Sequence, residues 1–581
     1  MLYPPCLAVL AASMDNGLAN TPPMTWRSWY SFFGAIDQPT MEVAMRAMAE
    51  KARVTPGRAG LVSYADLGYD RVGLDDGWQA CGAGVNGSFH DAGGNPIIDL
   101  GKFPDMGAMV GRARALGLKS GWYMNNCMCG EGALPLSPSF LDAALVGNVA
   151  AIARYGFSAV KLDGCGPHRN LTTWAALLNA TRPTLVEDCH WGNTVPTGGA
   201  PTPAPRPPSP GPPPFGPGLE GGCTGVDKSC PFNLYRATGD GINSFERVVA
   251  NLHGLLPFLG SDSTPPLSGP STWAFPDGLQ AGRFSGPWNA SEDRYAFGMY
   301  CVTSSPLVLG HNITDGATND RVWPVVANVE AIAVNQAWAG HPGRRVSAWG
   351  GGAAAAEAVR WPAGRAAYDV PCVPSDATQT GWSYNATSRA LQKDGQCLDM
   401  RAADNRQLWL APCKGGGGYK PQQWQWLGVN GSDGSASLNN LQNGGNATAP
   451  GAQNSFGFAR KHQPHLAWRV TGAHGQLMTA GDGAKRPPSC IAARSINPPP
   501  QTGPYELWSK PLSGGRVAAL LVNHGLPANV SFALAELGLA QGAKAVRDVW
   551  KHADLGPIAA GGSFTAELPV HDAAFLVLDP L

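Results

Sequence analysis

The sequence predicts a (β/α)8 barrel of parallel strands, followed by an all-β segment and a small antiparallel β domain. Between residues 24 and about 340, short apolar runs alternate with helix-like stretches, which is typical of a parallel α/β fold. The number of these units fits an eight-stranded barrel. From about residue 346, helix signals become rare and Gly, Asn and Gln become frequent, which indicates a change of fold class.

The barrel assignment depends on seven strand-like runs and the helices between them. The runs are 24–29, 71–74, 119–123, 159–162, 184–186, 234–237 and 306–309. The segments with helical periodicity are 41–52, 106–116, 141–155, 173–179 and 242–255. A doubly wound sheet is the alternative, but no Gly-x-Gly-x-x-Gly follows the first strand.

Length and charge limit the function classes. A chain of 581 residues has room for two to four domains. Its 42 basic and 42 acidic residues cancel, so nothing favours binding to nucleic acid or to an anionic membrane. The 19 tryptophans fit sugar binding by ring stacking, and they fit core packing equally well.

Domain boundaries are predicted from composition. Residues 1–17 are a possible signal peptide, although no basic region precedes the apolar run. The barrel takes 18–345 and carries a proline-rich loop insertion at 196–217. The β-rich segment 346–504 is read as an insert, and strand-like alternation resumes over 505–581.

Glycosylation signals and cysteines favour the secretory pathway. The sequon Asn-x-Ser/Thr occurs at Asn86, Asn170, Asn179, Asn289, Asn312, Asn385, Asn430, Asn446 and Asn529. There are 13 cysteines, and no Cys/His set has zinc-site spacing, so disulfides with one odd thiol are expected rather than a metal.

The run "AVKLDGCG" ends an apolar strand on a bare carboxylate, Asp163. Asp-Gly is a common turn, so Asp163 either caps a turn or faces a cleft. Other strand-like runs also end on polar groups, and in a barrel such ends line the active site. The polar groups at these strand ends are Asp75, Asp76, Tyr123, Arg236, Asp240 and Asp277. Together with Lys161, Trp29 and Trp78, they resemble the lining of a sugar-binding cleft.

Eight motifs follow one another in the order found in glycoside hydrolase family 27, the α-galactosidases and α-N-acetylgalactosaminidases. They are "TPPMTWRSWYSF", "GLDDGWQACG", "GLKSGWYMNN", "YGFSAVKLDGCG", "YRATGDGINSF", "FPDG", "SSPLVLGHNI" and "AIAVNQAWAGHPG". This resemblance covers about residues 18–342. It resumes over 505–581, where the chain resembles the C-terminal β-sandwich of the family.

The resemblance implies a retaining mechanism with two carboxyl groups about 5–5.5 Å apart. Asp163 would be the nucleophile and Asp240 the general acid/base. Lys161 would help to keep Asp163 ionised, because a nearby cation lowers the pKa of a carboxyl group. The remaining residues would bind the sugar: Trp29, Asp75, Asp76, Tyr123, His190, Arg236 and Asp277. No cofactor or metal is implied.

The chain departs from the family pattern at two places. His190 stands where many α-galactosidases carry a Glu that contacts the sugar 2-hydroxyl, so it either takes that role or points elsewhere. Gly77 stands where a cysteine often follows the aspartate pair. From the resemblance we expect Cys189 to pair with Cys230, and Cys165 with Cys127 or Cys129.

The insert contains one stretch that resembles a repeat of a ricin-type lectin, "GQCLDMRAADNRQLWLAPCKGGGGYKPQQWQW". Gln422 and Trp424 match its Gln-x-Trp signature, and Cys397 and Cys413 are placed for its internal disulfide. A β-trefoil needs three repeats and only one is clear, so a decorated loop of the sandwich is the alternative.

The sequence therefore predicts a secreted, vacuolar or lysosomal α-galactosidase that acts on galactose-terminated oligosaccharides or glycoconjugates. The alternatives are an α-N-acetylgalactosaminidase or a β-L-arabinopyranosidase on the same scaffold, or a non-catalytic glycan-binding protein. The presence of both Asp163 and Asp240 argues against the last, because binding alone does not require them.

Overall fold

The computed structural model describes most of the chain and divides it into two compact units. The described residues are 16–192, 230–241, 245–261, 265–284, 289–349, 365–371, 381–385, 387–400, 408–413, 424–427, 437–440, 468–470, 477–479, 489–495, 504–525 and 527–581. One unit comprises 1–204, 214–359 and 502–581, and the other comprises 205–213 and 360–501. The expected loop insertion at 196–217 and nearly all of the possible signal peptide lie outside the described residues.

The first unit contains the parallel barrel. Its strands are β1 (Met24–Arg27), β2 (Arg71–Leu74), β3 (Lys119–Met124), β4 (Ala159–Asp163), β5 (Leu185–Cys189), β6 (Leu234–Arg236), β7 (Trp273–Phe275) and β8 (Leu307–Leu309). They lie in the order β7-β6-β5-β4-β3-β2-β1-β8, and a parallel bridge between Leu279 and Leu309 joins the two ends. The predicted fold class is confirmed.

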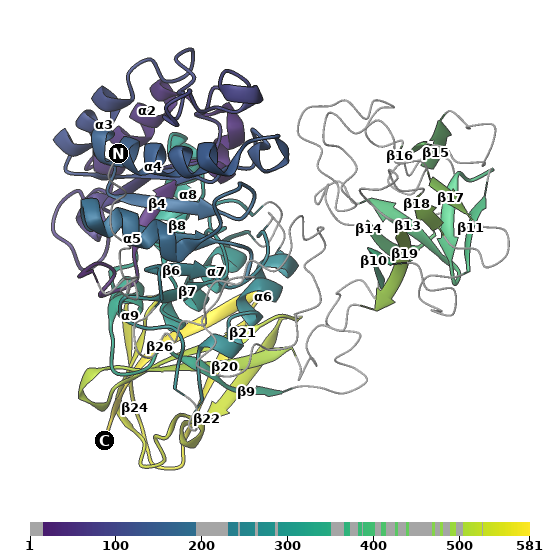
Figure 1. Ribbon diagram of the computed structural model, residues 1–581. Helices are drawn as coiled ribbons and strands as arrows, with labels where there is room; N and C mark the ends of the chain where they lie inside the picture. The colour runs from purple at the N-terminus through teal and green to yellow at the C-terminus, as the bar shows by residue number, and fades with distance from the viewer. Residues whose placement is uncertain are drawn as a thin grey trace. The chain divides into compact units, whose positions relative to one another are not determined.

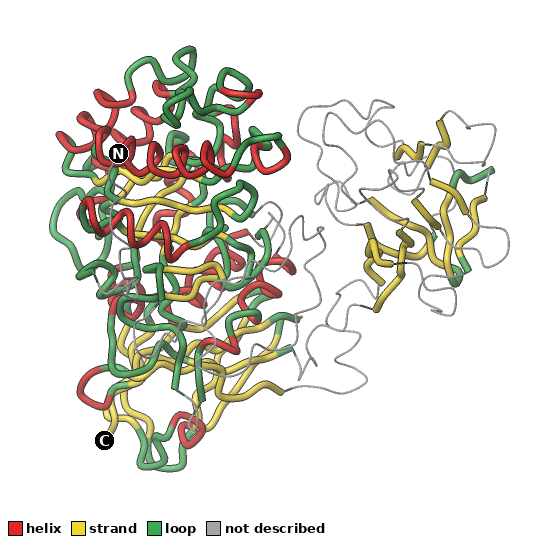
Figure 2. The backbone as a smooth tube through the Cα atoms, in the orientation of Figure 1, coloured by secondary structure: helices red, strands yellow, loops and turns green. Residues whose placement is uncertain are grey.

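Helices surround this sheet (Figures 1 and 2). They are α1 (Trp29–Phe32), α2 (Gln38–Ala49), α3 (Met106–Ala115), α4 (Pro138–Tyr155), α5 (Leu171–Thr181), α6 (Phe245–His253), α7 (Asn289–Val302), α8 (Gly316–Val326) and α9 (Val329–Gln336). Local sequence sets their ends. Helix α4 begins after Ser137, whose hydroxyl accepts from the Phe140 amide, and ends at Gly156 with φ of 86°.

The first unit also contains the C-terminal antiparallel sheets. They are formed by β9 (Arg344–Trp349), β20 (Tyr505–Pro511), β21 (Val517–Asn523), β22 (Ala528–Ala533), β23 (Ala543–Asp548), β24 (Ala553–Ile558), β25 (Ser563–Leu568) and β26 (Asp572–Pro580). Six strands lie in the order β24-β23-β26-β21-β20-β9, and β22 pairs with β25. Strand β9 therefore belongs to this sandwich, although it precedes the insert in sequence.

Barrel helices pack directly on the sandwich. Helix α7 contacts β20, β21 and β26. Arg547 of β23 binds both carboxylate oxygens of Glu330 in α9, at 2.8 and 3.0 Å. The buried Lys510 of β20 donates to the carbonyl oxygens of Val334 and Asn335. These contacts join the two layers into one body.

The second unit is an antiparallel sheet with a separate hairpin. Its strands are β10 (Arg365–Pro371), β11 (Trp382–Asn385), β12 (Ala390–Lys393), β13 (Gln396–Met400), β14 (Leu408–Pro412), β17 (Trp468–Val470), β18 (Leu477–Thr479) and β19 (Ser489–Ser495), beside the pair β15 (Trp424–Leu427) and β16 (Ser437–Asn440). A disulfide joins Cys397 to Cys413. Gln422 of the lectin signature lies outside the described residues, so the lectin assignment stays a prediction.

A search of the described residues for membrane spans finds no helix with both the length and the apolar character to cross a bilayer.

Candidate functional site

The polar residues identified in the sequence gather at the carboxyl ends of the barrel strands. Asp75 and Asp76 follow β2, Tyr123 lies in β3, and Lys161 and Asp163 lie in β4. Arg236 ends β6 and Asp277 follows β7, so these side chains come from five strands. All except the partly buried Lys161 are less than 9% exposed. The following contacts join Lys161 to Asp75, Tyr123 to Asp163, and Arg236 to Asp277.

Asp163 is held by hydrogen bonds on both carboxylate oxygens. Its Oδ2 accepts from the Tyr123 hydroxyl at 2.8 Å, and its Oδ1 accepts from the Gly164 amide at 2.7 Å. Burial raises the pKa of Asp163 to about 6, while the charge of Lys161 and the Tyr123 hydrogen bond oppose this shift. The group is therefore largely ionised at neutral pH, although burial disfavours its charged form.

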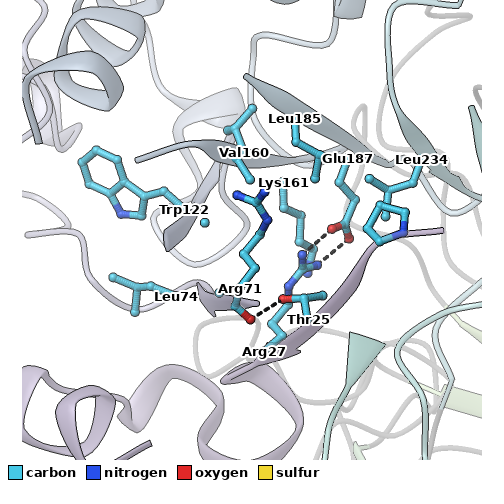
Figure 3. A pocket seen from close by; sticks show the side chains of 14 residues that line it. Thr25, Arg27, Arg71, Leu74, Trp122, Val160, Lys161, Leu185, Glu187 and Leu234 are labelled. Carbon is cyan, nitrogen blue, oxygen red and sulfur yellow. Dashed lines mark hydrogen bonds and ion pairs between the residues drawn. The ribbon is translucent and has the colours of Figure 1, made fainter. Parts of the chain in front are cut away.

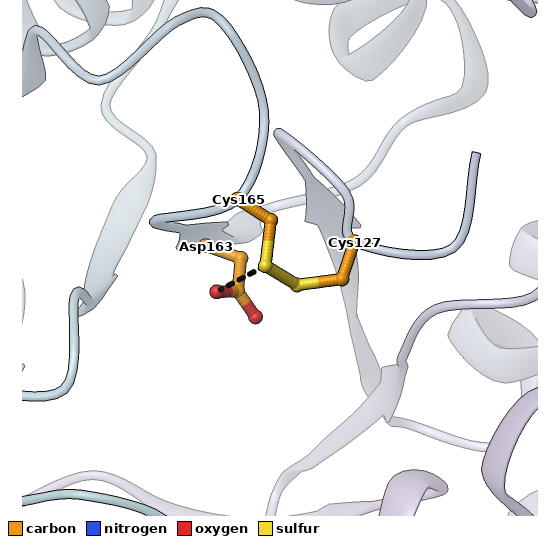
Figure 4. Close-up of side chains that lie close together, drawn as sticks. All are labelled: Cys127, Asp163 and Cys165. Atoms are coloured by element: carbon orange, nitrogen blue, oxygen red, sulfur yellow. Dashed lines mark hydrogen bonds between the residues drawn. A yellow bond between two sulfur atoms is a disulfide. The ribbon is translucent and has the colours of Figure 1, made fainter. Parts of the chain in front are cut away.

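A disulfide closes one side of this carboxylate. Cys127, after β3, is bonded to Cys165, after β4 (Figure 4). The sulfur of Cys165 lies 3.8 Å from Asp163 Oδ1, and because it carries no proton this is a contact and not a hydrogen bond. The disulfide fixes the two loops that follow neighbouring strands. A second disulfide, Cys81–Cys129, ties the β2 loop to the same region.

A layer of paired charges lies beneath the site, inside the barrel. Lys161 Nζ donates to Asp75 Oδ2 at 2.9 Å, and Arg27 Nε lies 3.6 Å from the same oxygen. Arg27 also makes a two-pronged ion pair with Glu187 of β5 (Figure 3). These carboxylates raise the pKa of Lys161 and Arg27 against the effect of burial, so both bases stay charged. The charged pairs border a small cavity within the barrel.

Asp76 is positioned by backbone donors. Its Oδ2 accepts from the amides of Met128 at 3.0 Å and Cys127 at 3.2 Å. Burial, with the neighbouring charge of Asp75, raises the pKa of Asp76 to about 7. At neutral pH Asp76 therefore exists partly as the neutral acid, which can donate a hydrogen bond to a ligand hydroxyl as well as accept one.

Arg236 connects the remaining two carboxylates. Its Nη2 donates to Asp240 Oδ1, and its Nη1 lies 3.6 Å from Asp277 Oδ1. The Asp240 side chain is 61% exposed, whereas that of Asp277 is 9% exposed. Of the two carboxylates that contact Arg236, the exposed Asp240 is therefore the one with room to move toward a bound ligand.

The expected pairing of Cys189 with Cys230 is wrong. Cys189 ends β5 as a buried free thiol, whereas Cys230 is disulfide-bonded. The Cys189 sulfur points into the site, 3.9 Å from Asp163 Oδ2 and 3.2 Å from Arg236 Nη1. A side chain directed into the barrel cannot also reach a loop outside it.

His190 is buried beside Asp188. Its backbone amide donates to Asp188 Oδ1 at 3.0 Å, and its ring Nδ1 lies 3.5 Å from the same oxygen. Burial lowers the pKa of His190 to about 4, so the imidazole is neutral at the pH of most assays. A neutral imidazole can donate from one ring nitrogen and accept at the other.

Two aromatic residues lie at the edge of the site. Trp29 is the half-buried first residue of α1, and its ring meets Phe33 edge to face at 5.4 Å. Trp191, at φ of 54°, lies over Gly164, where an added Cβ would be 2.8 Å from the indole. Gly164 therefore lets an aromatic ring approach the residue next to Asp163.

Sequence reasoning missed several residues of the site. Arg27 and Glu187 lie within strands and face the barrel interior, so only their alternation with apolar neighbours could have indicated them, and Cys189 was expected only as a disulfide partner. Trp191 follows His190 directly and could have been included with it. Cys81 follows Asp75 and Asp76 in the sequence, and nothing in its position indicated that it pairs with Cys129.

Comparison with known proteins identifies relatives of both layers. Residues 502–578 match the profile described as the alpha galactosidase C-terminal beta sandwich domain. The α-N-acetylgalactosaminidase of Mus musculus is 27% identical over 351 residues, which cover 57% of this chain and 72% of the relative. The α-galactosidase of Cyamopsis tetragonoloba is 27% identical over 344 residues, which cover 57% of this chain and 68% of the relative.

Solved structures share the fold. The crystal structure of α-galactosidase I from Mortierella vinacea has a TM-score of 0.55 at 16% identity and covers 97% of this chain and 99% of its own. A family 27 β-L-arabinopyranosidase from Geobacillus stearothermophilus has a TM-score of 0.53 at 14% identity and covers 97% of both chains.

A (β/α)8 barrel that gathers these carboxylates at its strand ends, together with this β-sandwich, defines a glycoside hydrolase. The chain is similar to glycoside hydrolase family 27, because its last domain matches the alpha galactosidase C-terminal beta sandwich and its matched relatives are α-galactosidases and α-N-acetylgalactosaminidases.

Proposed function

We propose that the protein is a retaining exo-glycosidase that removes terminal α-D-galactosyl residues, with Asp163 as the nucleophile and Asp240 as the general acid/base. The observation that carries this proposal is the environment of Asp163. Two hydrogen bonds and the nearby Lys161 favour the ionised form of a buried carboxylate at the carboxyl end of β4, the edge of a barrel at which active sites lie.

In the first step, one carboxylate oxygen of Asp163 attacks the anomeric carbon as the glycosidic bond breaks. The carboxylic acid form of Asp240 gives its proton to the departing oxygen. A glycosyl ester on Asp163 results, with the alcohol released. In the second step Asp240, now a carboxylate, takes a proton from water, which attacks the same carbon and returns Asp163 to its free form.

Arg236 influences when Asp240 can act. Its guanidinium binds Asp240, which favours the carboxylate and opposes the acid form. The exposed Asp240 must leave this contact to protonate a leaving group, whereas the contact suits the carboxylate that the second step needs. We therefore infer that substrate binding separates Asp240 from Arg236 before the first step.

The ligand hydroxyls are assigned to the other carboxylates. Asp75 and Asp76 would accept from two hydroxyls of the sugar, and Asp277 from a third, with Trp29 and Trp191 as apolar walls. Lys161 holds Asp75 in place through their 2.9 Å ion pair. This part of the proposal is supported by the convergence of these groups from separate strands.

His190 bears on the choice between a hydroxyl and an acetamide at C2. The family contains both activities, and relatives of both names match this chain at 27% identity. A buried, neutral imidazole offers one donor and one acceptor to a hydroxyl, and its bulk leaves less room for an acetamide. This favours the α-galactoside over the N-acetylgalactosaminide, and leaves a β-L-arabinopyranoside as the closest alternative substrate.

We further propose that the protein passes through the secretory pathway and acts on galactose-terminated oligosaccharides or glycoconjugates, with the insert binding glycans. The support is the disulfides among the barrel loops and the set of sequons, of which five lie in the described barrel: Asn86, Asn170, Asn179, Asn289 and Asn312. A glycan-binding insert would raise the effective concentration of substrate at the barrel.

The test is release of p-nitrophenol from its α-D-galactoside, α-N-acetylgalactosaminide and β-L-arabinopyranoside. We expect hydrolysis of the first, with kcat reduced at least about 1,000-fold in Asp163→Asn. In Asp240→Ala, added azide should restore turnover and yield a glycosyl azide with retained configuration, because azide needs no general base. A wild-type protein that binds galactose yet hydrolyses none of the three substrates would instead support a glycan-binding protein.

A further inference from the structure

A second cluster of ligand-type side chains lies where helix α6 meets the sandwich. It consists of His253 at the end of α6, Glu506 in β20 and His524 directly after β21. One ligand atom from each residue lies within 4.8 Å of the others. We propose that these three residues form a zinc site that joins the barrel to the sandwich.

The two distances from Glu506 to the histidines fit a tetrahedral zinc ion, and the ligand atoms of the two histidines lie within 4.8 Å of each other. Glu506 Oε2 lies 3.0 Å from His253 Nε2 and 3.5 Å from His524 Nε2. With zinc–ligand bonds of about 2.0–2.1 Å and tetrahedral angles, neighbouring ligand atoms are about 3.3 Å apart. The two imidazole rings stand at 67° with centroids 5.7 Å apart, so both can direct a nitrogen toward one point. Two histidines and one carboxylate are a common zinc ligand set.

Buried polar atoms without partners are a second, independent observation. The His524 side chain is 8% exposed, and its ring Nδ1 has no hydrogen-bond partner within the described residues, while its Nε2 lies 3.5 Å from Glu506 Oε2. The Tyr295 ring lies 5.3 Å from that of His524, and its buried hydroxyl also lacks a partner there. Such orphaned groups cost free energy, which a bound ion and its water would remove.

The surroundings of Glu506 resemble an outer shell around a metal ligand. Oε1 accepts from Arg345 at 2.8 Å, and Oε2 accepts from the Trp508 indole at 2.9 Å. Ligating carboxylates are usually held in this way by further donors. The His253 side chain is 12% exposed, so the cluster has a path to solvent.

Arg345 also sets the expected strength of the site. Its positive charge cancels the negative charge of Glu506. With two neutral histidines, the four side chains together would then offer a divalent ion no net negative charge. The site should therefore bind zinc more weakly than one without the arginine. It follows that Arg345→Gln should tighten zinc binding, which a hydrogen-bonded histidine cluster alone would not predict.

The experiment measures zinc uptake by the full chain, without a histidine tag, after dialysis against a chelator. We expect one zinc per chain by elemental analysis, a rise in melting temperature with ZnCl2 but not with MgCl2, and a visible d–d spectrum with Co²⁺. His253→Gln and His524→Gln, which preserve size and polarity, should each weaken zinc binding about 10- to 100-fold.

The matched control is His552→Gln. His552 also lies between the barrel and the sandwich, 2.8 Å from Glu330 and near Arg547, but the described residues place no second histidine beside it. This variant should bind zinc as the wild type does. The proposal is overturned if the folded wild type takes up no zinc, or if His253→Gln with His524→Gln combined leaves the uptake unchanged. Glycosidase activity is not the readout, so failure here leaves the proposed function untouched.

Discussion

At the scale of a single residue, the buried carboxylate of Asp163 should lower the free energy of unfolding of the protein at neutral pH. Burial raises its pKa from 3.8 in the unfolded chain to about 6 in the fold. Stability is therefore lost as pH rises from about 3.8 to 6, and the loss is complete above 6. Asp163→Asn should increase the free energy of unfolding by about 1–3 kcal/mol at pH 7 and by nothing near pH 3. Denaturant titrations of the wild type and Asp163→Asn at pH 3 and pH 7 measure this difference in unfolding free energy. An equal difference at the two pH values would contradict the prediction.

Lys161 should control the acid limb of the pH–rate profile. Its charge lowers the pKa of Asp163 against the effect of burial. With Lys161→Met, the pKa of Asp163 should rise further, so a higher pH is needed to ionise this proposed nucleophile. We expect the acid limb of kcat/KM, near pH 6 in the wild type, to move to higher pH. An unchanged limb with a lower plateau would mean that Lys161 acts only by binding substrate.

At the scale of an element, the turn after β4 depends on Gly164. A methyl group there would lie 2.8 Å from the Trp191 ring, so Gly164→Ala must displace either the tryptophan or Asp163. We expect kcat/KM to fall at least about tenfold, since small displacements of a reacting group are costly. The control is Gly111→Ala on the exposed face of α3, where an added methyl meets nothing within 4 Å. That change should preserve activity and stabilise the helix by about 0.5–1 kcal/mol.

The same elements show what sequence could and could not predict. Strands such as β4 are apolar runs ending on a polar residue, so both the barrel and the convergence of Asp75, Asp163 and Asp277 were predictable. Strand β7 has three residues and was recognised only by the Asp277 that follows it. The fate of Cys189 was not predictable, because pairing depends on the direction of a side chain and not on its spacing.

At the scale of the whole molecule, the insert interrupts the sandwich without breaking its sheet. Trp349 at the end of β9 pairs directly with Tyr505 at the start of β20, in an antiparallel register. The chain thus leaves and re-enters the first unit at neighbouring positions, and the described site residues all belong to that unit. An Asn-Gly turn in place of residues 350–504 should therefore close β9 and β20 into an ordinary hairpin.

This excision separates the role of the insert from that of the barrel. We expect the shortened protein to fold and to hydrolyse the p-nitrophenyl substrate with kcat/KM within about twofold of the wild type, because no described catalytic group is removed. On a galactose-bearing polymer its rate at low substrate should fall by about tenfold or more if the insert binds glycans, since tethering is then lost. If the shortened protein and the wild type hydrolyse the polymer at equal rates, the insert does not bind glycans in this way. If the folded, shortened protein loses activity on the p-nitrophenyl substrate, part of the active site lies in the insert.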